Sequence, residues 1–187
     1  MRKSRITRAN WAPTDYTPAR VADSPLGSDQ RVLLDEVYRD DDTGLFNRRA
    51  WNEARPRVDG DPDTEVLAVD IVGLKRTNDT LGHEAGDRLI GEVAKALSVI
   101  ASEWDIQSRN LWRIGGDEFV VAVPSGWADE FGRRLEEAVG MHPIRGTKFA
   151  SGVRYGVGAD FSAADHALLV ARDQLVQTHP RFAVRPS

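Results

Sequence analysis

Residues 110–123 read Asn-Leu-Trp-Arg-Ile-Gly-Gly-Asp-Glu-Phe-Val-Val-Ala-Val, and this stretch decides the fold of the chain. Two apolar runs, 110–114 and 119–123, are separated only by Gly-Gly-Asp-Glu. Short apolar runs joined by a glycine-containing turn predict a β-hairpin. The turn places two adjacent carboxylates, Asp117 and Glu118, at the tip of this hairpin.

A central strand is predicted upstream of the hairpin, over residues 65–71, where Glu-Val-Leu-Ala-Val-Asp-Ile is a nearly continuous apolar run. Such a run is typical of a strand that is covered on both faces. Asp70 comes at its carboxyl end, where α/β proteins place ligand-binding groups in a crevice. If the hairpin lies beside this strand, the carboxylates of Asp70, Asp117 and Glu118 converge.

The other periodic segments predict helices packed on one sheet. Apolar residues at helical spacing mark segments 47–58, 84–100 and 127–139. Pro56 is expected to disturb the end of the first helix. Residues 148–158 read as a further strand, and Ser-Ala-Ala-Asp at 162–165 has the form of a capping box that opens a last helix. We therefore predict a mixed α/β (α+β) domain over residues 40–178, followed by a tail over 179–187.

A basic leader precedes this domain. Residues 1–28 are rich in proline and polar residues and predict a flexible segment, while 29–39 predict a short lead-in helix. The net charge of the whole chain is −4, yet residues 1–20 hold five basic residues against one acidic residue. A basic arm on an acidic body can touch nucleic acid, but such arms are more often solvated tails. We therefore expect no nucleic-acid partner.

Composition excludes several classes of site. The chain has no cysteine, so disulfides, thiolate zinc sites and cysteine nucleophiles are absent. No apolar run approaches the roughly 20 residues that span a bilayer. The basic N-terminus lacks the apolar segment of a secretion signal. We therefore expect a cytoplasmic protein without a membrane partner.

Three converging carboxylates predict a metal site. Their mutual repulsion makes them costly to hold together unless a cation neutralises them, and hard oxygen ligands suit Mg²⁺ or Mn²⁺ bridging to phosphate. Gly115 and Gly116 would let backbone amides approach that phosphate closely. On its own, Gly-Gly-Asp-Glu is an ordinary turn composition, and a lone aspartate at a strand end is equally often a helix cap. The prediction of phosphoryl transfer therefore depends on the whole constellation.

The segment after Asp70 adds polar side chains suited to a nucleotide. Lys75 could reach a triphosphate as a compact charge. The carboxylate of Asp87 could accept from the N1–H and the exocyclic amine of guanine, an arrangement that adenine does not offer. Asn78 could add a second contact to the base, although a role in a turn is the commoner one for asparagine. These residues favour GTP as the nucleotide.

The chain resembles the GGDEF family of diguanylate cyclases over about residues 40–175. Three blocks carry the resemblance, at the spacing and in the order of the family. The first is Asp40 with Thr-Gly-Leu-Phe-Asn-Arg-Arg at 43–49, the second runs from Asp70 to Asp87, and the third is Arg-Ile-Gly-Gly-Asp-Glu-Phe at 113–119. Three ordered blocks are far more specific than a single pentapeptide.

The resemblance implies a fold similar to the palm of adenylyl cyclases and polymerases, with the signature on a hairpin beside the metal-binding strand. It implies that a homodimer condenses two GTP into cyclic di-GMP and two pyrophosphates. The family's metal ligands correspond to Asp70, the Ile71 carbonyl, Asp117 and Glu118. The phosphates would lie at Gly115 and Gly116, and guanine at Asn78 and Asp87.

Several positions depart from the family pattern. Val72 stands where many members have a second acid, and Arg172 replaces a usual lysine that binds phosphate. Val176 stands where the family usually has an arginine. The family's product-inhibition motif, Arg-x-x-Asp, is absent, because its two positions are Ile106 and Arg109 here. These departures leave an alternative open: a degenerate, weak or inactive domain that binds GTP and signals through protein contacts. Residues 1–39 are too short for a usual sensor, so we expect control by dimerisation through the lead-in helix or by a partner protein.

Overall fold

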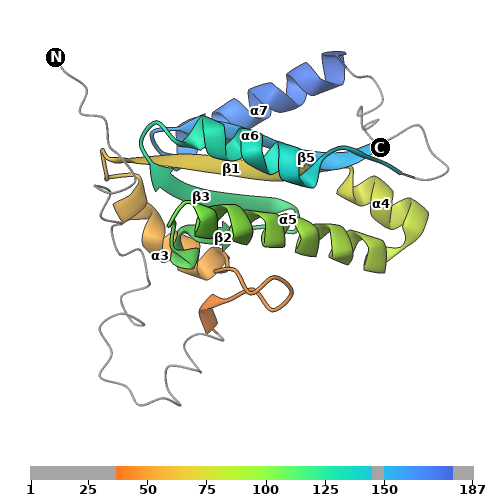
Figure 1. The fold of residues 1–187 in the computed structure, drawn as a ribbon, viewed down its shortest axis with the longest axis horizontal. Helices are drawn as coiled ribbons and strands as arrows, with labels where there is room; N and C mark the ends of the chain where they lie inside the picture. Colours follow the sequence, from red (N-terminus) through yellow and green to blue (C-terminus); the bar gives the residue numbers. More distant parts are fainter. Residues whose placement is uncertain (1–36, 145–149, 179–187) are drawn as a thin grey trace.

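The structure, a computed structural model, describes residues 37–144 and 150–178, with side chains up to Arg172 (Figure 1). The predicted leader, the tail and most of the lead-in helix lie outside the described residues. No helix of the described part is long and apolar enough to cross a membrane. The elements are α3 (Arg48–Val58), β1 (Thr64–Val72), α4 (Leu74–Leu81), α5 (His83–Glu103), a 3-10 turn η1 (Ser108–Asn110), β2 (Leu111–Arg113), β3 (Glu118–Pro124), α6 (Ala128–Val139), β4 (His142–Pro143), β5 (Ala150–Gly158) and α7 (Phe161–Thr178).

One five-stranded sheet forms the centre of the domain, in the order β2-β3-β1-β5-β4. The four pairings between these neighbouring strands are all antiparallel. The predicted hairpin is confirmed as β2 and β3, and the predicted central strand is confirmed as β1, which pairs with β3 on one side and β5 on the other. The α+β fold class is therefore confirmed, and antiparallel pairing determines where strand ends meet.

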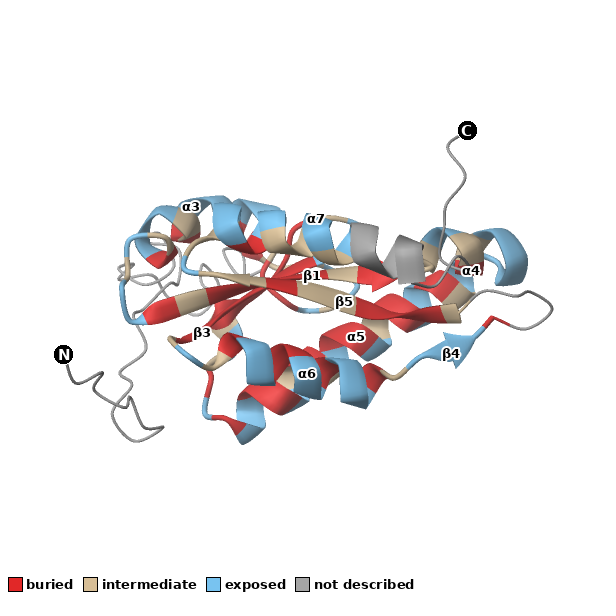
Figure 2. Cartoon of the chain, turned by 90° about the horizontal axis from the view of Figure 1, so that it is seen from above, coloured by how far each residue is buried: buried red, intermediate tan, exposed pale blue. Residues whose placement is uncertain are grey.

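Helices cover both faces of the sheet, α5 and α6 on one and α3 and α7 on the other (Figure 2). Successive residues of β1 enter different cores because side chains alternate along a strand. Leu67 and Val69 belong to the core under α5 and α6, whereas Val66 and Ala68 belong to the core under α3 and α7. All four are at most 3% exposed, which explains why β1 is nearly continuously apolar.

The predicted helices are present, with altered ends. Asn47 caps α3 by accepting a hydrogen bond from the amide of Ala50 (3.1 Å), and the helix runs two residues past Pro56. Helix α5 exceeds the predicted 84–100 at both ends. The short helix α4 was not predicted, because its eight residues include only two apolar side chains, one at each end.

The predicted capping box of the last helix is wrong. Helix α7 begins at Phe161, and the preceding residue, Asp160, caps it by accepting from the amide of Ala163 (2.8 Å). The Ser162 hydroxyl instead accepts a hydrogen bond from Arg55 of α3 (3.2 Å). Both Asp160 and Ser162 are good capping residues, and the backbone leaving β5 brings the aspartate to the helix start.

Candidate active site

The end of β1 meets the tip of the β2–β3 hairpin. Asp70 on β1 is the register partner of Glu118 on β3, and the amide of Ile71 donates to the carbonyl of Asp117 (3.0 Å). This proximity follows from antiparallel pairing, in which one strand's end lies beside its neighbour's start. Asp70 therefore lies next to the turn as predicted. The reason is antiparallel pairing with β3, and not the crevice at the carboxyl ends of parallel strands.

The hairpin turn is tight. The amide of Ile114 donates to the carbonyl of Glu118 (2.8 Å), and Glu118 already belongs to β3. The loop between the strands is therefore 114–117, which has the predicted length of four residues but starts one position earlier. Gly115 leaves room for the Glu118 carboxylate, which a Cβ at this position would push aside. Gly116 is exposed and has open space around its Cα. The turn thus presents backbone, rather than side chains, to any group that approaches Gly116.

Arg113 fixes this turn to the segment that enters α3. Its side chain is only 9% exposed and donates to Asp40 (2.9 Å), Asp42 (2.9 Å) and the carbonyl of Gly116 (3.0 Å). Burial raises the pKa of Asp40, but hydrogen bonds from Thr43 and Arg113 outweigh it and leave that pKa below its usual value. Arg113 was not among the predicted site residues, although a basic residue inside an apolar strand is a signal of a buried ion pair.

Asp70 is the most perturbed carboxylate of the site. Its side chain is 15% exposed and forms an ion pair with Arg154, its register partner on β5. Burial raises the pKa of Asp70 to about 6, against the opposing effect of Arg154; Asp117 raises it further and Arg172 lowers it. Within the described residues, Asp70 Oδ2 accepts no well-formed hydrogen bond. Arg154 was not among the predicted site residues.

The other two carboxylates lie in more open surroundings. Glu118 is 51% exposed and pairs with Arg48 at the start of α3 (3.5 Å), while Asp117 is partly buried in the turn. In the described part of the chain, no three histidine or acidic side chains gather closely enough to hold a metal ion. The backbone thus brings the three predicted carboxylates to one place. Two of their side chains are paired with arginines, Asp70 with Arg154 and Glu118 with Arg48.

The donor chemistry of the site nevertheless fits a divalent cation. Three carboxylates and the Ile71 carbonyl lie at the junction of β1 and the turn, and all offer the hard oxygens that Mg²⁺ and Mn²⁺ prefer. A buried carboxylate with a raised pKa is also one that gains from a nearby positive charge.

The predicted base-reading residues lie on the two successive helices that follow β1, α4 and α5. Gly73 (φ +79°) turns the chain from β1 into α4, whose first turn carries the exposed Lys75. Asn78 of α4 packs against Gly86 of α5, where a Cβ would overlap the Asn78 side-chain oxygen, and Asp87 follows in an exposed position. Asn78 thus lies beside the residue that precedes Asp87.

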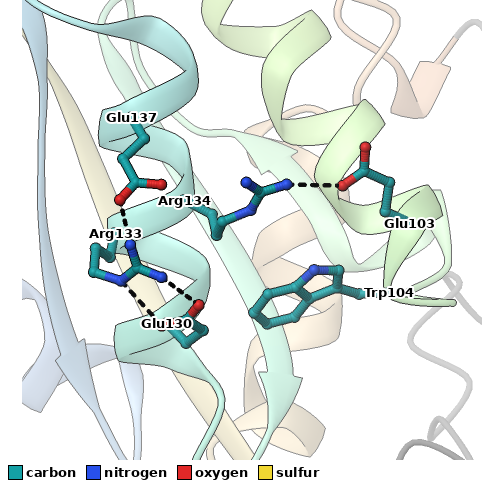
Figure 3. Close-up of a pocket in the computed structure, with 6 residues that line it drawn as sticks. All are labelled: Glu103, Trp104, Glu130, Arg133, Arg134 and Glu137. Atoms are coloured by element: carbon teal, nitrogen blue, oxygen red, sulfur yellow. Dashed lines mark hydrogen bonds and ion pairs between the residues drawn. The ribbon is translucent and has the colours of Figure 1, made fainter.

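A separate surface pocket of about 550 Å³ lies between the end of α5 and α6 (Figure 3). Its arginines are already paired: Arg133 contacts Glu130 and Glu137, and Arg134 contacts Glu103 (3.2 Å). It includes none of the predicted site residues. We therefore assign the candidate site to the junction of β1 and the hairpin, not to this pocket.

Several curated proteins are similar in sequence to this chain. The curated relatives include the response regulator PleD of Caulobacter vibrioides, 35% identical over 154 residues, or 79% of this chain and 30% of PleD. The probable diguanylate cyclase DgcC of Escherichia coli is 36% identical over 103 residues, or 52% of this chain and 27% of DgcC. The chain therefore spans less than a third of either relative.

Solved structures share the fold. The diguanylate cyclase SiaD of Pseudomonas aeruginosa, solved with its activator SiaC, has a TM-score of 0.61 and 27% identity over 78% of this chain and 62% of that chain. The coiled coil and GGDEF domain of DgcB from Caulobacter crescentus, solved with c-di-GMP, has a TM-score of 0.59 and 26% identity over 90% of this chain and 98% of that chain.

The sequence profile described as "Diguanylate cyclase, GGDEF domain" matches residues 37–174, which include both the hairpin and the end of β1. This match covers well over half of the chain, and it agrees with the relatives and the fold. The chain therefore belongs to the GGDEF domain family of diguanylate cyclases.

Proposed function

We propose that this chain is an active diguanylate cyclase that condenses two GTP into cyclic di-GMP. The observation that carries the proposal is the pairing of Asp70 with Glu118 beside the Gly115–Gly116 turn, inside a domain of the cyclase family. In each half-reaction the 3′-oxygen of one GTP bonds to the α-phosphorus of the other. The bond between the α-phosphorus and the bridging oxygen breaks, pyrophosphate leaves, and the hydroxyl proton passes to solvent.

Asp70, Asp117, Glu118 and the Ile71 carbonyl would hold Mg²⁺ or Mn²⁺. When bound, such ions lower the pKa of an attacking hydroxyl and neutralise charge on the transferred phosphoryl group and on pyrophosphate. The protein holds these ligands on one rigid junction, because β1 and β3 are hydrogen-bonded there and Arg113 clamps the turn. A rigid backbone keeps these four ligand positions close together while the side chains turn toward the metal.

The remaining predicted residues would position GTP. The exposed backbone at Gly116 and the neighbouring Gly115 would receive phosphates, with Lys75 and Arg172 supplying positive charge. Asn78 on α4 and Asp87 on the first part of α5 would recognise guanine, and the two helices meet where Asn78 packs against Gly86. Selection would come from the donors of guanine, since an unpaired Asp87 carboxylate disfavours a base that lacks them.

Catalysis would need two copies of the domain. Each domain offers one nucleotide site, so two GTP react only when two domains face each other. Bringing two reactants together can supply several kcal/mol of the barrier, about 7–11 in the best cases. Anything that changes how often two domains meet would change the rate, and we propose that a partner protein is one such regulator. The activator-bound structure of SiaD is a precedent among the structural relatives.

The direct test is product formation. Purified protein would be incubated with GTP and Mg²⁺ or Mn²⁺, and the products resolved by mass spectrometry. We expect cyclic di-GMP from the natural protein, none from Asp117→Ala, and undiminished product from Asp129→Ala, which alters an acid at the start of α6. Thermal melts would verify that both variants are folded.

Two results would count against the proposal. GTP binding without any cyclic dinucleotide at high protein concentration would favour a nucleotide-binding signalling module instead. A mixed guanine–adenine product, formed when ATP is added beside GTP, would leave the cyclase activity in place but overturn the role of Asp87.

A further inference from the structure

Three charged side chains form a row across three neighbouring strands. Asp70 of β1 is the register partner of Glu118 on β3 and of Arg154 on β5. Residues directly opposite each other on antiparallel strands project from the same face of the sheet. That face carries Val66 and Ala68 of β1, which pack under α3 and α7. Arg154 therefore lies on the same side of the sheet as Asp70 and Glu118, two of the three carboxylates proposed to bind metal.

The Arg154–Asp70 pair is deep. The two side chains are 16% and 15% exposed, and a guanidinium nitrogen of Arg154 contacts Asp70 Oδ2. Water screens such a pair less than it screens an exposed pair, so the positive charge of Arg154 opposes a second cation that approaches the carboxylate.

The guanidinium has little else to hold it in place. In the part of the chain that the structure describes, Arg154 Nε is buried and has no hydrogen-bond partner, and the contact with Asp70 is the ion pair that the side chain makes. By contrast, Arg113, the other deeply buried arginine beside the turn, has three separate acceptors. Arg154 is therefore held mainly by the carboxylate that a metal ion would need.

We propose that Arg154 competes with the divalent cation for Asp70, so that metal binds only when the guanidinium leaves this carboxylate. This inference deepens the proposed function and rests on its metal site. In the metal-free protein Arg154 neutralises a buried carboxylate that would otherwise be unpaired. When a cation takes its place, the long side chain can turn toward the phosphates that arrive with the nucleotide, where positive charge is again favourable.

A purely structural ion pair predicts the opposite outcome. If Arg154 only stabilises the sheet, its removal destabilises the fold and leaves metal affinity unchanged or lower. If it competes with metal, its removal raises metal affinity even though the metal-free fold becomes less stable. The two explanations therefore differ in whether removal of Arg154 raises the metal affinity.

The experiment is Mn²⁺ binding to the purified chain, measured by electron paramagnetic resonance at pH 8, with and without a non-hydrolysable GTP analogue. Arg154→Gln should bind Mn²⁺ about tenfold more tightly, equivalent to one neighbouring charge worth about 1.4 kcal/mol. Arg154→Lys, which keeps the charge, should stay near the natural protein. Arg134→Gln, which removes an arginine from an exposed ion pair on α6, should change nothing.

A double-mutant comparison identifies the carboxylate concerned. Asp70→Asn should weaken Mn²⁺ binding. Adding Arg154→Gln to this variant should not raise the Mn²⁺ affinity, because the carboxylate for which Arg154 and the cation compete is no longer present. Unchanged or weaker binding by Arg154→Gln, no detectable binding by either protein, or a gain that persists with Asp70→Asn would each overturn the proposal.

Melting curves and product formation distinguish a failure of this inference from a folding defect and from a failure of the proposed cyclase activity. If Arg154→Gln does not fold without metal, recovery of a cooperative melt on adding Mn²⁺ supports the competition, and failure to recover overturns it. Tighter Mn²⁺ binding without any cyclic di-GMP would support the role of Arg154 and reject the proposed cyclase activity.

Discussion

At the scale of single residues, Gly86 links fold to base recognition. It lies in the first turn of α5, and any side chain there would displace Asn78, because a Cβ would overlap the Asn78 side-chain oxygen. Gly86→Ala should therefore lower GTP affinity about five- to tenfold, as expected for one displaced hydrogen-bonding group. ATP affinity should stay the same. Calorimetric titration with both nucleotides measures the change in selectivity.

Gly91→Ala is the matched control on the same helix. A Cβ at Gly91 meets nothing within 4 Å, so the substitution adds helix propensity without a clash. It should raise the free energy of unfolding by about 0.4–1 kcal/mol and leave GTP binding unchanged. Equal losses of GTP binding in the two variants would show that the Gly86–Asn78 contact is not what matters.

Asp70 makes the stability of the metal-free protein depend on pH. Its pKa is raised to about 6 in the fold, mainly by burial, from the ordinary value of 3.8. Between these values the folded chain binds the proton more than the unfolded chain does, so stability falls as pH rises from about 4 to about 6. The difference in unfolding free energy between the natural protein and Asp70→Asn should shift in favour of the variant across this window.

Urea unfolding in EDTA at several pH values measures that difference. The other acids contribute equally to both proteins and cancel in the comparison. A difference that stays constant from pH 4 to 7 would mean that the fold does not raise the pKa of Asp70.

At the scale of elements, the start of α7 tests which residue caps it. Asp160 accepts from the amide of Ala163, whereas Ser162 contacts Arg55. Asp160→Ala should lower the free energy of unfolding by about 1 kcal/mol, the usual value of a side-chain cap. Ser162→Ala should cost less, since its hydrogen bond to Arg55 is exposed. Urea denaturation compares the two, and a larger loss at Ser162 would restore the capping box.

Elements with strong periodicity could be predicted from the sequence, and those without it could not. The apolar stripe of α5 and the runs of β1 and β3 are local patterns, so they identified these elements before their neighbours were known. Helix α4 lacks such a stripe, and its ends are set by glycines with positive φ at 73 and 82, which turn the chain on either side of it. The residue at which α7 begins could not be predicted either, because it depends on the direction in which β5 leaves the sheet.

The parts of the candidate site that border apolar strands could be predicted from the sequence, and the parts that depend on strand register could not. Asp70 and the turn could be placed together because both bordered apolar strands. The Arg154–Asp70 pair could not, since it depends on the register between β1 and β5, which are far apart in the chain. The role of Arg113 likewise depends on a loop, Asp40–Gly44, that only the folded chain brings beside the turn.

At the scale of the whole molecule, the proposed reaction should depend on how two copies meet. While dimers are a minority, the rate of cyclic di-GMP formation should rise with the square of protein concentration, and it should become linear once dimers dominate. A dilution series with saturating GTP measures this. The same chain fused to a dimeric coiled coil should give a linear series throughout, and a linear series from the unfused chain at every dilution would contradict weak dimerisation.

The position of β1 limits how the proposed enzyme could be regulated. Its backbone is bonded to β3 on one side and β5 on the other, and a core covers each face, so its amides can exchange with solvent only when the domain unfolds as a whole. A regulator therefore cannot act by shifting the main chain that carries Asp70. Control has to act through side chains, or through the encounter of two domains whose interiors stay the same.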